Sequence, residues 1–159
     1  MNVPIIVYYH GLFFIGPKLL GSALSVVHEQ MQAFRQSGLE DNASEFNVGI
    51  NGGPESAGLA KRLLPAKSKI TFHGLESRAE NLTVMMLWNR ACELKSEAYI
   101  CYTHAKGASH PIGDSYGETV SKPWRRAMME DLVTNWRQCV AALDEGHDIA
   151  CSHWMWNMA

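Results

Sequence analysis

A buried strand that ends in polar side chains stands out in the sequence. Residues 99–102 (Tyr-Ile-Cys-Tyr) are apolar or aromatic and contain no glycine or proline, which is typical of a buried strand. Thr103, His104 and Lys106 follow at once with a hydroxyl, an imidazole and an ammonium group, and Gly107 allows the backbone to turn. Ligands of open α/β sheets bind just beyond the carboxyl ends of the strands. This polar cluster is therefore the first candidate binding site, although a strand that ends in a solvated loop fits equally well.

Other predicted strands end in a comparable way. The apolar run 3–9 ends in His10-Gly11. If this strand lies beside the strand at 99–102, as in the usual doubly wound order, His10 and His104 face the same crevice. The backbone N–H groups of residues 51–53 (Asn-Gly-Gly) could approach a phosphate. A plain turn is the simpler interpretation, because Pro54 removes a donor and the Gly-x-Gly-x-x-Gly spacing is absent.

The spacing of possible ligands and nucleophiles gives little support for a metal centre or a catalytic serine. The sequence has no Cys-x-x-Cys, no His-Glu-x-x-His and no Asp-x-Asp. Ser109 and His110 are adjacent, but no Gly-x-Ser-x-Gly elbow surrounds them. We predict no metal ligands and leave a requirement for a divalent cation open. Arg125 and Arg126 could clamp a phosphate or carboxylate, or they could belong to a solvated helix face above Trp124.

The rest of the chain alternates between predicted strands and helices. The strands are expected at 3–9, 46–50, 69–73, 99–102 and 148–151, and the helices at 20–37, 55–64, 80–94 and 124–143. We expect the helix at 80–94 to be buried on more than one side, and residues 107–123 to form a loop. Five alternations predict a mostly parallel, five-stranded sheet covered on both faces. The fold class is therefore α/β, a Rossmann-like three-layer sandwich, with residues 1–159 as a single domain.

Composition narrows the class of partner. Hydrophobic residues make up 47% and charged residues 19%, and the net charge is −2, so no broad basic field favours nucleic acid or an anionic membrane. No apolar run reaches the roughly 18 residues of a membrane span. Residues 1–16 lack a basic start, which favours a strand over a signal peptide. The four cysteines (Cys92, Cys101, Cys139, Cys151) are scattered in apolar contexts, which predicts free thiols in the cytoplasm and not disulfides.

Several segments carry a resemblance to a known family. Residues 102–107 (Tyr-Thr-His-Ala-Lys-Gly), with Ser109-His110-Pro111, resemble the LYxHTKG-x-S-x-P segment of glycosyltransferase-like proteins from bacterial and viral polysaccharide gene sets. Residues 124–125 (Trp-Arg) and 136–139 (Trp-Arg-Gln-Cys) fit the family's following helix. Residues 27–38, 48–50, 146–149 and 152–154 also fit the family's pattern, so the resemblance covers most of the chain. Ala105 replaces the family's threonine. The resemblance implies a continuation past the position of Ala159 into an acceptor-binding portion, so this chain resembles a fragment, a divergent short form or a chain completed by a partner.

The resemblance implies a GT-A-like domain that binds a nucleotide-sugar and transfers the sugar to a glycan or polysaccharide acceptor. The charge that develops on the leaving nucleoside diphosphate must be neutralised by a metal or by cationic and N–H donors. We expect the nucleotide-sugar contacts to come from the strand ends and the long helix, namely from His10, Thr103, His104, Lys106, Gly107 and Arg125. Asp148 or His153 is expected to act on the acceptor.

Two other interpretations stay open. A non-catalytic binding or interaction module would keep the same sheet without turnover, and a hydrolase is the third possibility. The terminal segment 152–159 contains Trp154, Met155, Trp156 and Met158. Because an apolar patch of this size is unfavourable in water, we expect the segment to pack across the open sheet edge or against a second copy of the chain, and we favour self-association.

Overall fold

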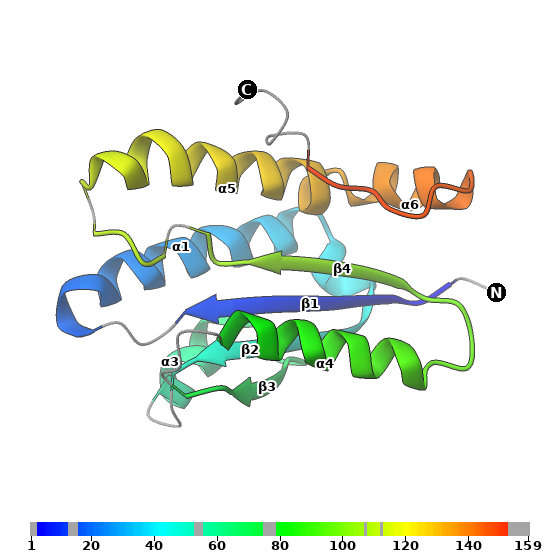
Figure 1. Cartoon of the computed structure of the whole chain (residues 1–159), viewed down its shortest axis with the longest axis horizontal. Helices are drawn as coiled ribbons and strands as arrows, with labels where there is room; N and C mark the ends of the chain where they lie inside the picture. The colour runs from blue at the N-terminus through cyan, green and yellow to red at the C-terminus, as the bar shows by residue number, and fades with distance from the viewer. Residues whose placement is uncertain are drawn as a thin grey trace.

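The chain forms a parallel β-sheet with helices on both faces, as the computed structural model shows (Figure 1). The structure describes residues 3–12, 16–52, 56–74, 79–106, 108–111 and 113–152. The described strands are β1 (Ile5–Leu12), β2 (Ala43–Asn51), β3 (Lys69–Phe72) and β4 (Tyr99–His104). They lie in the order β3-β2-β1-β4, and each neighbouring pair is parallel. The predicted α/β class and parallel sheet are confirmed.

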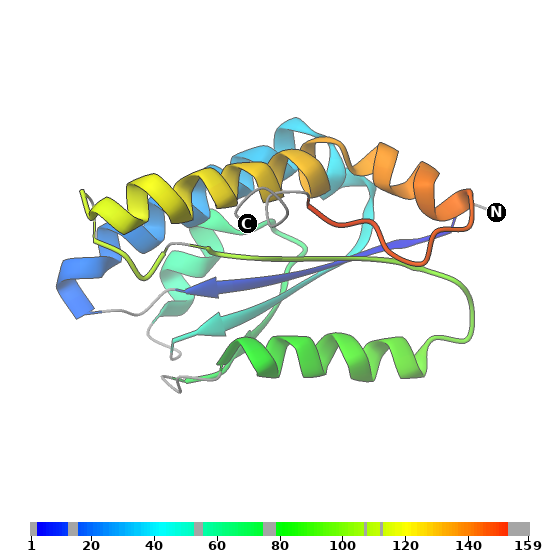
Figure 2. The same ribbon diagram turned by 45° about the horizontal axis from the view of Figure 1, so that its top comes forward.

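Helices connect these strands and lie in two layers. The described helical elements are α1 (Gly16–Gln36), α2 (Leu39–Asn42), α3 (Ala57–Leu63), α4 (Ala79–Glu93), η2 (Gly117–Ser121), α5 (Lys122–Met129), η3 (Glu130–Thr134) and α6 (Trp136–Asp144). Figure 2 shows α4 on one face of the sheet and α1, α5 and α6 on the other. This arrangement is compatible with the expected three-layer, Rossmann-like sandwich. None of the described helices is both long enough and apolar enough to cross a membrane.

One face of the sheet is apolar and packs against α1. Tyr9 of β1 is fully buried there, and its ring meets Phe34 edge-on with 6.4 Å between the ring centres. Val27, Met31 and Phe34 recur at helical spacing, so α1 presents one apolar stripe to this face. Gly38 follows the helix with a φ of 74°, a left-handed conformation that suits glycine. The helix predicted at 20–37 and its glycine stop are therefore confirmed.

Residues 148–151 do not form the fifth strand expected from the sequence. The described residues form a four-stranded sheet, and the segment passes beside β4 without joining it. It follows a turn at Gly146, where φ is 98°, and Ile149 remains 77% exposed. The prediction failed because a short apolar run does not by itself specify strand pairing. In the described part of the chain, β4 is therefore an edge strand.

The prediction that the helix at 80–94 is buried on more than one side is wrong. Val84, Met85 and Trp88 of α4 are 44%, 58% and 67% exposed. The helix lies alone on its face of the sheet in the described structure, so only one side of it can be covered (Figure 2). Apolar residues crowd the sequence of α4, but their number does not reveal how many neighbours the helix has.

The long helix predicted at 124–143 begins earlier and is interrupted. Helical residues start at Ser115, so the expected loop at 107–123 is shorter than predicted. Two wide, π-helical turns, η2 and η3, flank α5, and Asn135 leaves the helical conformation with φ of −96° and ψ of 24°. Such turns insert extra residues and redirect a helix. The sequence analysis did not predict the π-helical turns or the break at Asn135, because the apolar periodicity continues across them.

The segment expected to drive self-association falls mostly outside the described residues. Of residues 152–159, the structure describes only Ser152, whose hydroxyl donates to the carboxylate of Asp131 at 2.8 Å. Packing against the sheet edge and self-association both remain predictions.

Candidate functional site

His10 and His104 lie side by side where the sheet changes direction. They are paired in register on the parallel strands β1 and β4, so both side chains point to the same face. The chain moves from β1 to β2 to β3 in one direction and then crosses to β4 on the other side of β1. The crevice at such a switch point is where open α/β sheets bind ligands. The predicted juxtaposition of the two histidines is confirmed.

A polar network links the sheet to α4 beside this crevice. Thr83 of α4 is fully buried, and its hydroxyl lies 2.8 Å from Nδ1 of His10 and 3.0 Å from Nε2 of His73. The two imidazoles stack with 6.2 Å between their centres. A hydroxyl has one hydrogen, so it donates to one imidazole and accepts from the other. The network therefore suits two neutral histidines with defined tautomers.

Glu80 is a site residue that the sequence analysis missed. Its carboxylate accepts a hydrogen bond from the Tyr102 hydroxyl at 2.8 Å and lies 3.7 Å from Nδ1 of His104. Burial lowers the pKa values of His10, His104 and Lys106, and the negative charge of Glu80 partly opposes this shift. One signal was available. A helix that follows a parallel strand begins at the carboxyl edge, so the first turn of α4 had to lie near the site.

Lys106 lies just beyond β4 and is held in place by two neighbours. Its ammonium group is 3.8 Å from the ring centre of Trp124, a cation–π contact. Nη1 of Arg125 donates to the backbone carbonyl of Lys106 at 3.0 Å. The backbone N–H of Ala105 donates to the carbonyl of His10 at 2.8 Å, which carries the pairing with β1 past the end of the strand. Burial lowers the pKa of Lys106, and Glu80 opposes that shift.

Arg125 joins this loop to an adjoining polar pocket. Nη2 of Arg125 donates to Glu29 of α1 at 2.9 Å, and only 7% of the arginine side chain is exposed. The pocket beside Arg125 has a volume of about 330 Å³, and its lining includes Ser22, Lys122 and Arg126. A second cavity, of about 340 Å³, lies elsewhere in the molecule. Ser22 Oγ and Arg125 Nε are buried without a hydrogen-bond partner. Such atoms favour a polar ligand, because unsatisfied buried donors are costly.

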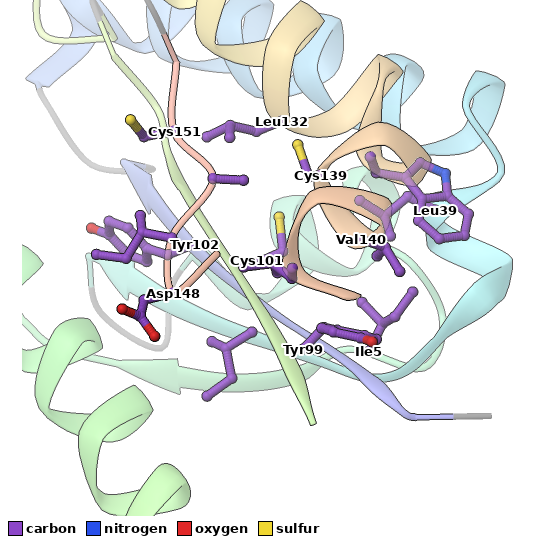
Figure 3. Close-up of a pocket in the computed structure, with 15 residues that line it drawn as sticks. Ile5, Leu39, Tyr99, Cys101, Tyr102, Leu132, Cys139, Val140, Asp148 and Cys151 are labelled. Atoms are coloured by element: carbon purple, nitrogen blue, oxygen red, sulfur yellow. The ribbon is translucent and has the colours of Figure 1, made fainter. Parts of the chain in front are cut away.

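The remaining predicted site residues lie apart from this cluster or cannot be placed. Thr103 pairs in register with Tyr9, so its side chain points to the α1 face, away from His104. Asp148 lines the apolar cavity beside β4 and α6 (Figure 3), whose lining includes neither His104 nor Lys106. Gly107 and His153 lie outside the described residues. Within the described ranges, no group of three or more histidine, cysteine, aspartate or glutamate side chains could hold a metal ion.

The histidine network predicts a loss of stability in mild acid. Burial is the main cause that lowers the pKa of His10 from 6.5 to about 4, and it also lowers the pKa of His73. Between pH 6.5 and about pH 4, His10 is protonated in the unfolded chain but neutral in the folded protein. The free energy of unfolding therefore falls as the pH drops below 6.5. From His10 alone, we expect the free energy of unfolding to be roughly 2 kcal/mol lower at pH 5 than at pH 7.

Urea denaturation at pH 5, 6 and 7 would measure this dependence. His10→Gln should flatten the slope, whereas His147→Gln, at an exposed position, should preserve it. Equal slopes for the wild-type protein and the His10 variant would contradict the prediction.

The fold and the site together define an α/β protein with a cluster of polar side chains at the switch point of a parallel sheet. No protein-family model matches the chain, and no curated protein matches it.

Proposed function

We propose that the switch-point crevice binds the diphosphate of a nucleotide-sugar, and that the chain is a GT-A-like glycosyltransferase domain of polysaccharide synthesis. The observation that supports this proposal is the convergence of His10, His104 and Lys106 at the carboxyl ends of β1 and β4. That position is the ligand-binding edge of open α/β sheets. The sugar-transfer reaction itself rests on the resemblance of residues 102–107 to the glycosyltransferase-like family.

Lys106 is the proposed cation for the diphosphate. Its backbone carbonyl is fixed by Arg125, and its side chain is oriented by Trp124, so the ammonium group needs little reorganisation to meet a phosphate oxygen. The N-terminus of α1 follows β1 at the same edge and adds backbone N–H groups that favour an anion. The unpaired Nε of Arg125 would complete the donor set. Contacts from Gly107 remain a prediction, and the screen below tests whether a divalent cation is required.

We propose that His104, and not Asp148, takes the proton from the acceptor hydroxyl, because Asp148 lines the separate apolar cavity. Burial lowers the pKa of His104, so the imidazole is neutral at pH 7 and can accept a proton. Glu80 beside Nδ1 favours the tautomer that leaves Nε2 basic. In the transfer step the acceptor hydroxyl gives its proton to Nε2, and its oxygen bonds to the anomeric carbon. The bond from that carbon to the diphosphate oxygen breaks, and its electron pair leaves with the diphosphate.

The test is a binding screen of the wild-type chain against nucleoside diphosphates and their sugars, with and without manganese. A ligand that binds the folded state raises the melting temperature by mass action. Lys106→Ala should weaken the binding of that ligand at least tenfold by calorimetry, because a charge-assisted contact is lost. The circular dichroism spectrum should stay unchanged. Lys95→Ala removes an exposed lysine between α4 and β4, and it is the matched control.

The outcomes separate the competing functions. Unchanged affinity in the Lys106 variant would remove this residue from the site, and no response to any nucleotide would defeat the proposal. Binding without consumption of the donor would favour the non-catalytic module. Release of free sugar without an acceptor would favour a hydrolase.

A further inference from the structure

An apolar cavity lies between the edge strand β4, helix α6 and residues 148–151 (Figure 3). Its volume is about 340 Å³. Folded proteins contain few voids larger than a water molecule, whereas sites for small molecules measure from about 300 Å³ upward. The lining side chains are mainly aliphatic, aromatic or sulfur-containing, and they include Ile5, Cys101, Leu132, Cys139, Val140 and Leu143. The cavity is therefore large enough for a ligand and apolar in its walls.

The polar tips of the lining residues are turned to partners outside the cavity. The Tyr99 hydroxyl donates to Asp144, and the Tyr102 hydroxyl donates to Glu80. Trp136 Nε1 donates to the carbonyl of Ser37 at 3.2 Å. What these aromatic residues present to the cavity is their ring surface.

The thiols of Cys101 and Cys139 and the positions of the unpaired buried polar atoms also indicate that the cavity has an apolar wall. The Cys139 thiol donates to the carbonyl of Asp131 at 3.2 Å. Burial raises the pKa of Cys101 to about 12 and also raises that of Cys139, so both thiols stay protonated at neutral pH. Among the described residues, the buried side-chain N and O atoms that lack a hydrogen-bond partner all belong to residues outside the cavity lining.

These features decide which ligands the cavity can hold. A sugar or nucleotide would bring hydroxyl and phosphate groups that find no partners on the wall, and each unpaired polar group would cost binding energy. A cation would meet neutral thiols inside the cavity and could pair only with the carboxylate of Asp148, which is exposed to solvent and therefore attracts it weakly. Asp148 is the one charged side chain among the described lining residues, and it is exposed, so a carboxylate-bearing ligand would meet a like charge. An uncharged hydrocarbon ligand meets none of these costs.

We propose that this cavity is a binding site for an uncharged small molecule of largely hydrocarbon character, such as an aromatic ring system. The site goes beyond the proposed nucleotide-sugar function and does not depend on it. The ligand inserts between the apolar face of β4 and the inner side of α6, and residues 148–151 form the remaining side of the pocket. Binding removes the apolar lining from water and adds van der Waals contacts to ring faces and sulfur atoms.

Titration of the full chain with the neutral fluorophore N-phenyl-1-naphthylamine tests the proposal. We expect saturable fluorescence enhancement at one site and a rise in melting temperature. Val140→Trp and Leu143→Trp place large side chains into the cavity from α6 and should each weaken binding at least tenfold. Their circular dichroism spectra should stay those of the wild-type chain. Two filling variants are used so that misfolding of one does not decide the result.

The control addresses the other apolar surface to which the dye could adhere. Trp88→Ala removes the most exposed of the large apolar side chains on α4 and should leave the affinity unchanged. The proposal is overturned if the wild-type chain shows no saturable binding. It is also overturned if both folded filling variants bind like the wild type, or if only the Trp88 variant loses binding.

Discussion

Replacing Gly49 with alanine should lower the free energy of unfolding by about 3 kcal/mol, because overpacking a rigid interior is costly. Gly49 lies on β2 in register with His10, under the helix α4. An added Cβ would stand 1.9 Å from Thr83 Oγ1 and 2.4 Å from His73 Nε2, far inside contact distance. Thr83 is fully buried and cannot swing into solvent, so α4 must move or the two histidines must lose their shared hydroxyl. Urea denaturation at pH 7 measures the change.

A matched substitution on α3 separates this steric effect from the general effect of glycine. An added Cβ at Gly58 meets nothing within 4 Å, so Gly58→Ala should stabilise the protein by up to about 1 kcal/mol. In the Gly49→Ala background, Thr83→Ala should cost much less than it does alone, because it removes the hydroxyl that clashes with the added Cβ. A Gly49→Ala protein as stable as the wild type would show that the strand and helix are not packed as described.

The part of the site that lies on the strands could be predicted from the sequence by the general rules of parallel sheets. The apolar runs that became β1 and β4 were recognisable, and the doubly wound order placed them side by side, so His10 and His104 could be paired in advance. The fifth strand could not be predicted correctly from the same kind of run. Residues 148–151 have the composition of a strand, but strand pairing depends on a partner edge and on the turn at Gly146.

The sequence pattern could place the first turn of α4 near the site, but it could not identify which side chains of α4 belong to the site. In the sequence, Glu80 and Thr83 are ordinary residues of a predicted helix. Only the packing of α4 on the sheet brings Glu80 to Tyr102 and Thr83 to His10. Gly49 leaves room for Thr83 and His73, with which a side chain at this position would clash. A glycine adds nothing to the apolar periodicity of a strand, so this role could not be predicted from the sequence. Arg125 was recognised as a candidate, but its guanidinium already holds the Lys106 carbonyl and Glu29.

Replacing Glu29 with glutamine should lower the free energy of unfolding by about 3 kcal/mol, because it leaves a buried charge without its counter-ion. Nη2 of Arg125 lies 2.9 Å from the Glu29 carboxylate, and only 7% of the arginine side chain is exposed. After the substitution the guanidinium still donates to the neutral carbonyl of Lys106, but it has lost the charged partner that Glu29 provides and cannot move into water without leaving the site. The melting temperature should fall by roughly 10 °C for a chain of this length.

The same substitution in the same polar pocket supplies the control. Glu118 pairs with Lys122 at 2.8 Å, but 51% of the Glu118 side chain is exposed, so Glu118→Gln should have little effect on stability. Adding Arg125→Met to Glu29→Gln removes the stranded charge and should recover part of the lost stability, which a double-mutant cycle measures as a coupling energy. Because Arg125 positions Lys106, the recovered protein should still bind nucleotides more weakly than the wild type. If Glu29→Gln and Glu118→Gln were equally mild, the ion pair of Arg125 would not be what holds the Lys106 loop in place.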